Sequence, residues 1–130
     1  LLPTEEISEI ERLVAAGDEA SLIAALAIEN DNVEAVTALA LLLVERSSEG
    51  DREAALKLLE RIPESAETRR IAAMARVEPV EDVEMTLGEL LSAVKDDDEA
   101  RQRFVDLLEV LGPDDPRTAG WRRRLTSTLF

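Results

Sequence analysis

The chain has 130 residues, 45 % of them hydrophobic and 2 % aromatic, which predicts one globular domain over residues 1–130 with an all-α fold, because Ala, Leu, Val and Ile supply the apolar content. It contains no cysteine and no histidine, so disulfides, thiol chemistry and the commonest metal ligand and general base are excluded, and we expect no catalytic activity, no cofactor and no metal site. A net charge of −14 repels nucleic-acid phosphates, so we do not expect nucleic acid as a partner.

Helical periodicity, cap residues and helix breakers predict eight helices along the chain. The expected ranges, in chain order, are 4–16, 18–28, 33–46, 51–62, 65–78, 83–94, 96–111 and 115–130. Gly17 and Gly112 are expected to stop the helices that precede them, whereas Asp51 is expected to cap the fourth helix. Apolar spacing places Ile7 and Ile23 on the inward faces of the first two helices.

The third of these helices should be the central and most buried one, because its segment from Leu39 to Val44 is apolar nearly all round. The longest apolar stretch runs from Ala35 to Val44 and is interrupted by Thr37, which is far below the roughly 20 residues that a membrane span needs. No signal peptide is recognisable at the start of the sequence. We therefore expect no membrane association and a cytoplasmic location.

A weak internal repeat accompanies the helices. The segment GDEASLIAALA opens at Gly17, and the similar segment GDREAALKLLE opens 33 residues later at Gly50. Helix pairs at this spacing are typical of solenoid arrays of the tetratricopeptide or ankyrin sort, and the TPLH-type segment of ankyrin repeats is not present. The pattern predicts a degenerate tetratricopeptide-like array of helical hairpins, with a generic helical bundle as the alternative.

The last 14 residues differ in charge from the rest of the chain. They hold four arginines and no acid, so they carry +4, whereas the preceding 116 residues carry −18. Such an asymmetry indicates a contact with a partner, in which arginines meet acidic residues and apolar side chains act as anchors. The candidate contact residues are Arg117, Trp121, Arg122, Arg123, Arg124, Leu125, Leu129 and Phe130.

A structural interpretation of the same residues stays open. Arginines near the C-terminus of a helix complement the helix dipole and an acidic body. Trp121, the single tryptophan, would in that case pack on the preceding helix near Phe104 and Leu108 instead of anchoring a partner.

Two acidic clusters and the two methionines also need an interpretation. The run from Asp96 to Glu99 holds enough carboxylates for a calcium or magnesium site, but consecutive acids at a helix start point around the helix rather than converging on an ion. We interpret this run as a helix start, and the acids at 81, 82 and 84 as a solvated surface. Met74 and Met85 are expected to fill the core rather than to line a groove.

Three segments of the chain carry a family resemblance, namely GDREAALKLLERIPE at 50–64, EARQRFVDLLEVLGPDDP at 99–116, and the ending from RRRL to LF at 122–130. They resemble the C-terminal region of the YbbN-like chaperedoxins, thioredoxin-fold co-chaperones in which a degenerate tetratricopeptide array follows the thioredoxin domain. The resemblance extends over essentially the whole chain. The thioredoxin domain itself is absent from these 130 residues, and the stretch from Arg76 to Met85 is shorter than the linking hairpin of the family.

The resemblance implies a protein-protein interaction module of a thioredoxin-like co-chaperone that helps to hand unfolded client proteins to the chaperonin. It further implies that the helix from Arg117 to Phe130 contacts the chaperonin. A different class of function stays open, in which the chain is a structural domain that self-associates and positions an attached thioredoxin domain. For the oligomeric state, both a monomer and a weak dimer are compatible with the sequence.

Overall fold

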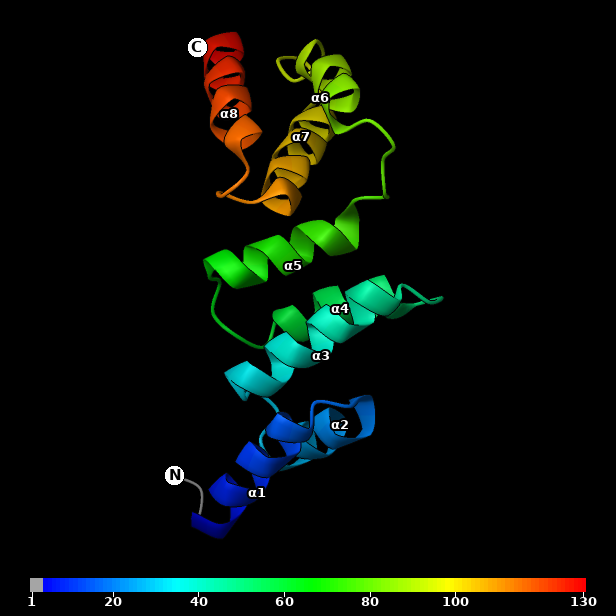
Figure 1. The fold of residues 1–130 in the computed structure, drawn as a ribbon, viewed down its shortest axis with the longest axis vertical. Coiled ribbons are helices and arrows are strands. Elements are labelled where there is room, and N and C mark those ends of the chain that lie inside the picture. The colour runs from blue at the N-terminus through cyan, green and yellow to red at the C-terminus, as the bar shows by residue number, and fades with distance from the viewer. Residues whose placement is uncertain (1–3) are drawn as a thin grey trace. The chain divides into compact units, whose positions relative to one another are not determined.

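The computed structural model describes residues 4–130, which form eight helices and no strand (Figure 1). The prediction of an all-α fold of about eight helices is therefore confirmed over this range. The helices, in chain order, are α1 (Thr4–Ala16), α2 (Glu19–Ile28), α3 (Val33–Arg46), α4 (Asp51–Leu59), α5 (Ala66–Arg76), α6 (Val83–Leu91), α7 (Asp98–Leu111) and α8 (Pro116–Leu129).

The chain divides into two compact units, Leu1–Ala72 and Ala73–Phe130, with the boundary inside α5. Each unit contains its own set of packed helices. That the two units together make a single domain over residues 1–130 stays a prediction, and its first three residues lie outside the described part of the chain.

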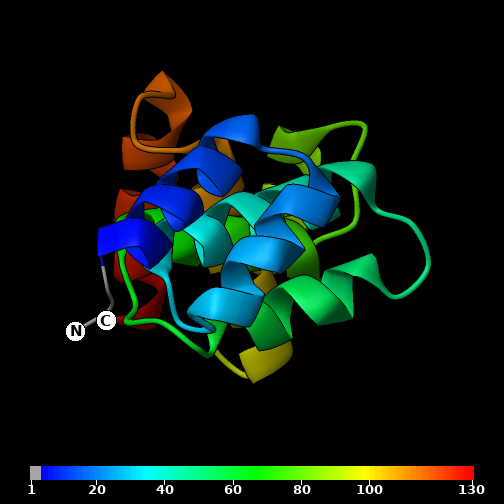
Figure 2. The same cartoon turned by 90° about the horizontal axis from the view of Figure 1, so that it is seen from below.

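In the Leu1–Ala72 unit, the consecutive helices from α1 to α4 pack on one another as a hairpin array requires. Helix α3 contacts α1, α2 and α4, and Figure 2 shows α1, α2 and α3 side by side. The expectation that α3 is the most buried helix of this unit is confirmed. Its buried residues are Ala35, Val36, Leu39, Ala40, Leu43 and Val44.

The two glycines expected to stop helices do so. Gly17 and Gly112 have φ angles of +74° and +84°, a left-handed backbone that side chains with a Cβ rarely adopt. The amide N–H groups of these glycines donate to the carbonyl oxygens of Leu13 and Leu108 at 3.3 and 3.0 Å, so each glycine still closes the last turn of its helix.

Three helices end earlier than the sequence pattern predicted. Helix α4 ends at Leu59 instead of residue 62. The next residues make hydrogen bonds to the carbonyl oxygen three residues back instead of four, such as the bond from Arg61 N to the Leu58 carbonyl oxygen at 3.0 Å. The residue before a proline avoids the α conformation, so Pro63 shortens this helix. Helices α5 and α6 end at Arg76 and Leu91 rather than at residues 78 and 94. The prediction ran past both ends because apolar spacing continues through the turns that follow these helices.

The expectation for Asp51 is wrong. The cap of α4 is Gly50, which has no side chain to accept a bond, and Asp51 is the first residue of the helix. The Asp51 carboxylate instead accepts from the backbone N–H of Ser48 and from the guanidinium of Arg46. In the other copy of the repeat, Asp18 does cap α2, because its carboxylate accepts from the backbone N–H of Ser21 at 3.1 Å.

Several inward positions predicted from spacing are also wrong. Ile7, Ile23 and Met85 are exposed, and Met74 is only half-buried. Helical spacing marks a stripe, but it does not say whether a neighbouring helix covers the whole of that stripe. The acidic interpretations agree better with the structure, because Asp97 caps α7 and the acids at 81, 82 and 84 are exposed.

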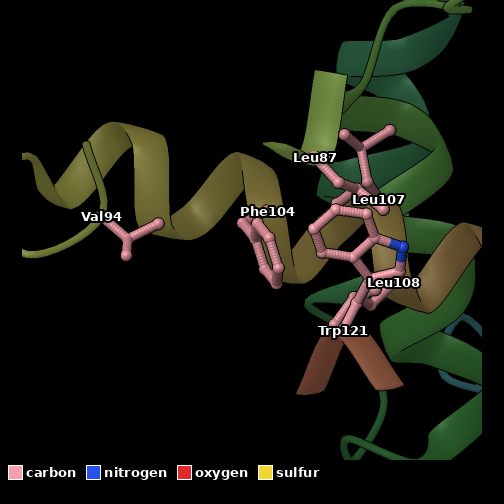
Figure 3. Packing of buried hydrophobic residues seen from close by; sticks show 6 residues of the cluster. All are labelled: Leu87, Val94, Phe104, Leu107, Leu108 and Trp121. Carbon is pink, nitrogen blue, oxygen red and sulfur yellow. The ribbon is translucent and has the colours of Figure 1, made fainter. Parts of the chain in front are cut away.

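The Ala73–Phe130 unit packs α6, α7 and α8 around two aromatic rings. Figure 3 shows the indole of Trp121 lying against Leu107 and Leu108. The ring centroids of Trp121 and Phe104 are 6.1 Å apart and the two planes meet at 72°, an edge-to-face arrangement that aromatic pairs favour. The buried cluster consists of Leu87, Val94, Phe104, Leu107, Leu108 and Trp121.

Candidate functional site

The N-terminus of α8 is fixed by local bonds. The Asp115 carboxylate accepts from the backbone N–H of Arg117 at 2.9 Å, and Pro116 occupies the first turn, where a missing N–H costs nothing. The buried hydroxyl of Thr118 donates to the carbonyl oxygen of Gly112 at 2.7 Å. These contacts hold the start of α8 to the end of α7 and so set the direction in which its arginines project.

One face of α8 packs inward. Trp121 is only 8 % exposed, while Leu125 and Leu129 are half-buried and pack against the same cluster. The structure thus places Trp121 beside Phe104 and Leu108, as the structural interpretation expected. The three apolar anchors within α8 therefore pack against the core of their own unit. Only the part of their surface that stays exposed is available to a partner.

The four arginines of α8 are exposed but have different surroundings. Arg117 pairs with Asp115 at 2.9 Å, and Arg122 lies 3.8 Å from a carboxylate oxygen of Glu109. The guanidinium carbon of Arg124 lies 4.2 Å from the centroid of the Trp121 ring, which is a cation–π contact.

Arg123 is the arginine with no partner. Within the described residues its guanidinium makes no ion pair, hydrogen bond or ring contact. A cation with no partner inside the molecule breaks no existing contact when it binds a carboxylate of another molecule. Arg123 is therefore the best placed of the four to contact a partner.

An open groove of about 760 Å³ runs along α8, and we call it the α8 groove. Its walls combine apolar surface, the hydroxyl-bearing side chains of Ser127 and Thr128, three guanidinium groups and one carboxylate. The lining residues are Glu84, Leu91, Pro116, Arg117, Gly120, Trp121, Arg123, Arg124, Ser127 and Thr128. A groove with this lining suits a peptide segment that carries both a carboxylate and an apolar side chain.

A second exposed surface of α8 overlaps the α8 groove at Arg123 and Ser127, and we call it the outer face. It consists of Arg122, Arg123, Thr126, Ser127 and the C-cap residue Phe130, all of which are exposed. Phe130 is 96 % exposed, so it is the largest apolar side chain that α8 leaves in water. A cationic face with an aromatic tip is a second arrangement that fits a protein partner.

Electrostatics keep the start of the groove charged. The Arg117 guanidinium bonds the Asp115 carboxylate, and this bond, together with the backbone N–H of Arg117, lowers the pKa of Asp115 below its usual value. The same bond raises the pKa of Arg117. Both effects favour the ionised forms of the two groups, so the charged pair at the start of α8 is stabilised.

Residues 4–130 contain no cluster of three or more acidic side chains arranged to hold a metal ion. Within the same range, none of the helices combines the length and the apolar character that crossing a bilayer requires.

The sequence located the segment but not the geometry of the site. Seven of the eight predicted contact residues lie on α8 and Phe130 is its C-cap, yet their division between core, groove and outer face came only with the structure. The Arg124–Trp121 contact was missed, although the i, i+3 spacing of the two residues could have signalled it, because side chains at that spacing meet on a helix.

Comparison with known proteins gives one finding. A family model described as tetratricopeptide repeat matches residues 12–130. No curated protein and no solved structure shows significant similarity to the chain.

Proposed function

The chain belongs to the tetratricopeptide repeat family, and we propose that its protein-binding element is α8. Helical arrays of this kind expose extended surfaces on which they bind other proteins. The observation that carries the proposal is Arg123, an unpaired guanidinium in a groove that Trp121 also lines. Tryptophan and arginine are the residues most enriched where binding energy concentrates.

The proposed partner surface is acidic with an apolar residue nearby. Three arginines of α8 line the groove, and the net charge of −14 for the whole chain makes this a local cationic site on an acidic molecule. A carboxylate of the partner would bond Arg123, while an apolar side chain would lie along Leu91 and Trp121. This arrangement requires no catalytic group, and the proposal includes no enzymatic activity.

The finer proposal concerns the identity of the partner. The resemblance of residues 50–64 and 99–130 to the C-terminal region of the YbbN-like chaperedoxins supports a co-chaperone role, with the chaperonin as a partner of α8 and unfolded clients as its cargo. It also supports a cytoplasmic location. In this proposal a thioredoxin domain, where the full protein has one, would be attached to the array.

Deleting α8 is a poor test of these proposals. Trp121 and Thr118 are buried, so a chain without α8 would expose Phe104 and remove the bond from the Thr118 hydroxyl to the Gly112 carbonyl oxygen. Loss of binding by such a deletion would then report unfolding as much as recognition. Substitution of an exposed residue avoids this ambiguity.

The matched pair Arg123→Glu and Arg103→Glu supplies the test. Arg103 is exposed on α7, so its substitution produces the same change in net charge away from the groove. Binding of each protein to purified chaperonin is measured by surface plasmon resonance. We expect Arg123→Glu to weaken binding at least about tenfold, the effect of losing a hot-spot arginine, and Arg103→Glu to bind like the wild type.

Two results would count against the proposal. Equal binding by the wild type and Arg123→Glu would remove the α8 groove from the interface. Absence of binding by the wild type would remove the chaperonin as a partner.

A further inference from the structure

A second groove, which we call the α1–α3 groove, lies in the Leu1–Ala72 unit. It has a volume of about 360 Å³, and its lining residues are Ile7, Ile10, Glu11, Glu29, Asn32, Val33 and Glu34. Ile7 and Val33 are large apolar side chains that remain 43 % and 55 % exposed. Apolar side chains that are left in water at the rim of a groove indicate a surface that another molecule covers.

The rim of this groove is acidic. Glu11, Glu29 and Glu34 line it, and within the described residues none of their carboxylates makes an ion pair. The guanidinium of Arg61 is nearby in the chain fold but donates to the carbonyl oxygen of Asn30 at 3.2 Å. Residues 1–72 hold 16 acidic and 7 basic side chains, so the surrounding field also favours a cationic occupant.

The outer face of α8 has the complementary chemistry. It presents Arg122 and Arg123 together with Phe130, which is 96 % exposed. We propose that the outer face of α8 docks in the α1–α3 groove of a second copy of this chain. In that contact Phe130 covers Ile7 and Val33, and the two arginines lie among the rim carboxylates.

The proposed contact leaves each fold intact. Trp121 holds the opposite side of α8 in the core of its own unit, so the helix does not need to leave that unit in order to bind. The α1–α3 groove and the outer face are different surfaces, so each copy of the chain carries both halves of the contact.

The association should be weak and sensitive to salt. Seven lining residues are far fewer than the roughly 20–30 residues that each partner contributes to a stable interface. Exposed charge pairs are screened at moderate ionic strength. This inference deepens the proposed function, because it names one partner of α8, and it rests on α8 being a binding element.

Sedimentation equilibrium of the full chain at low salt tests the inference by means of a charge swap. The wild type should show a mass that rises with concentration. The groove variant Glu11→Arg/Glu34→Arg and the face variant Arg122→Glu/Arg123→Glu should each associate at least about tenfold more weakly. A mixture of the two variants should associate again, because a cationic groove then meets an anionic face.

The matched control is Glu45→Arg/Glu49→Arg, which has the same change in charge at two exposed positions outside the groove. This control should associate at least as well as the wild type. Circular dichroism of every variant checks that the helices remain folded, and the restored association of the mixture cannot be produced by unfolded proteins.

A wild type that stays monomeric at every concentration would overturn the inference, and so would a groove variant that associates normally or a mixture that fails to associate. These outcomes differ from a failure of the proposed function. The groove variant has an unaltered α8, so it should still bind the chaperonin. Chaperonin binding by a strictly monomeric wild type would remove self-association alone.

Discussion

The two compact units reach the same fold class with different cores. In Leu1–Ala72, completely buried alanines occur on three successive helices, Ala25 on α2, Ala35 and Ala40 on α3 and Ala55 on α4, so the helices can approach one another closely. In Ala73–Phe130 the core is built around Phe104 and Trp121. The first core depends on small alanine side chains, and the second depends on two large aromatic rings.

Each unit nevertheless contains a buried aspartate whose carboxylate accepts hydrogen bonds from two other residues. Asp51 accepts from Arg46 and from the Ser48 backbone N–H. In the other unit, Asp106 on α7 accepts from Arg76 at 3.1 Å and from Gln102 at 2.9 Å. The acidic composition of the chain is thus not only a solvated surface, because a buried carboxylate must be paired.

The largest expected effect is on the aromatic core. Trp121→Ala should reduce the free energy of unfolding of the Ala73–Phe130 unit by about 3–5 kcal/mol, the usual cost of removing a large buried side chain. Urea unfolding followed by circular dichroism measures the effect, and hydrogen exchange assigns it to one unit. The control Phe130→Ala removes an exposed ring of the same helix and should leave stability nearly unchanged. A similar loss in both variants would contradict the assigned core.

The alanine core should respond to the opposite change. Ala40 is completely buried, so Ala40→Leu should destabilise the Leu1–Ala72 unit by about 1–3 kcal/mol through overpacking. Ala27→Leu makes the same enlargement at an exposed position of α2 and should cost little. Thermal unfolding of the two variants measures the difference. Equal melting temperatures of the two variants would contradict the close packing around Ala40 on α3.

The smallest expected effect concerns pH. The Arg46 guanidinium lowers the pKa of Asp51 in the folded chain, so the carboxylate stabilises the fold above its unfolded pKa of about 3.9, and this stabilisation disappears as the pH falls through the folded pKa. Asp51→Asn should therefore lower the melting temperature at neutral pH, and the difference from the wild type should shrink below about pH 4. A difference that is independent of pH would exclude the charge as its cause.

Much of the fold could be predicted from local chemistry. Glycines at 17 and 112, proline at 116 and acidic residues at helix starts each act within one turn, so the existence and order of the helices followed from the sequence. The helix ends at Leu59 and Leu91 could not be predicted, because apolar spacing continues into the turns. Neither could the division into two units, since it depends on which stripes meet in space.

The candidate site was predictable in its location but not in its surfaces. Charge alone identified the last 14 residues. Whether Trp121 points inward depends on its packing against Phe104 and Leu108 of α7. Whether Arg123 is left without an ion pair depends on which acidic side chains the neighbouring arginines bind. The α1–α3 groove gave no signal in the sequence, because Ile7 has the spacing of a core residue and yet is exposed.

The most direct measurement is chaperonin binding by the wild type, Arg123→Glu and Arg103→Glu under identical conditions. If α8 is the docking element, the wild type and Arg103→Glu bind alike and Arg123→Glu binds at least about tenfold more weakly. Indistinguishable binding by all three proteins would contradict that role for α8.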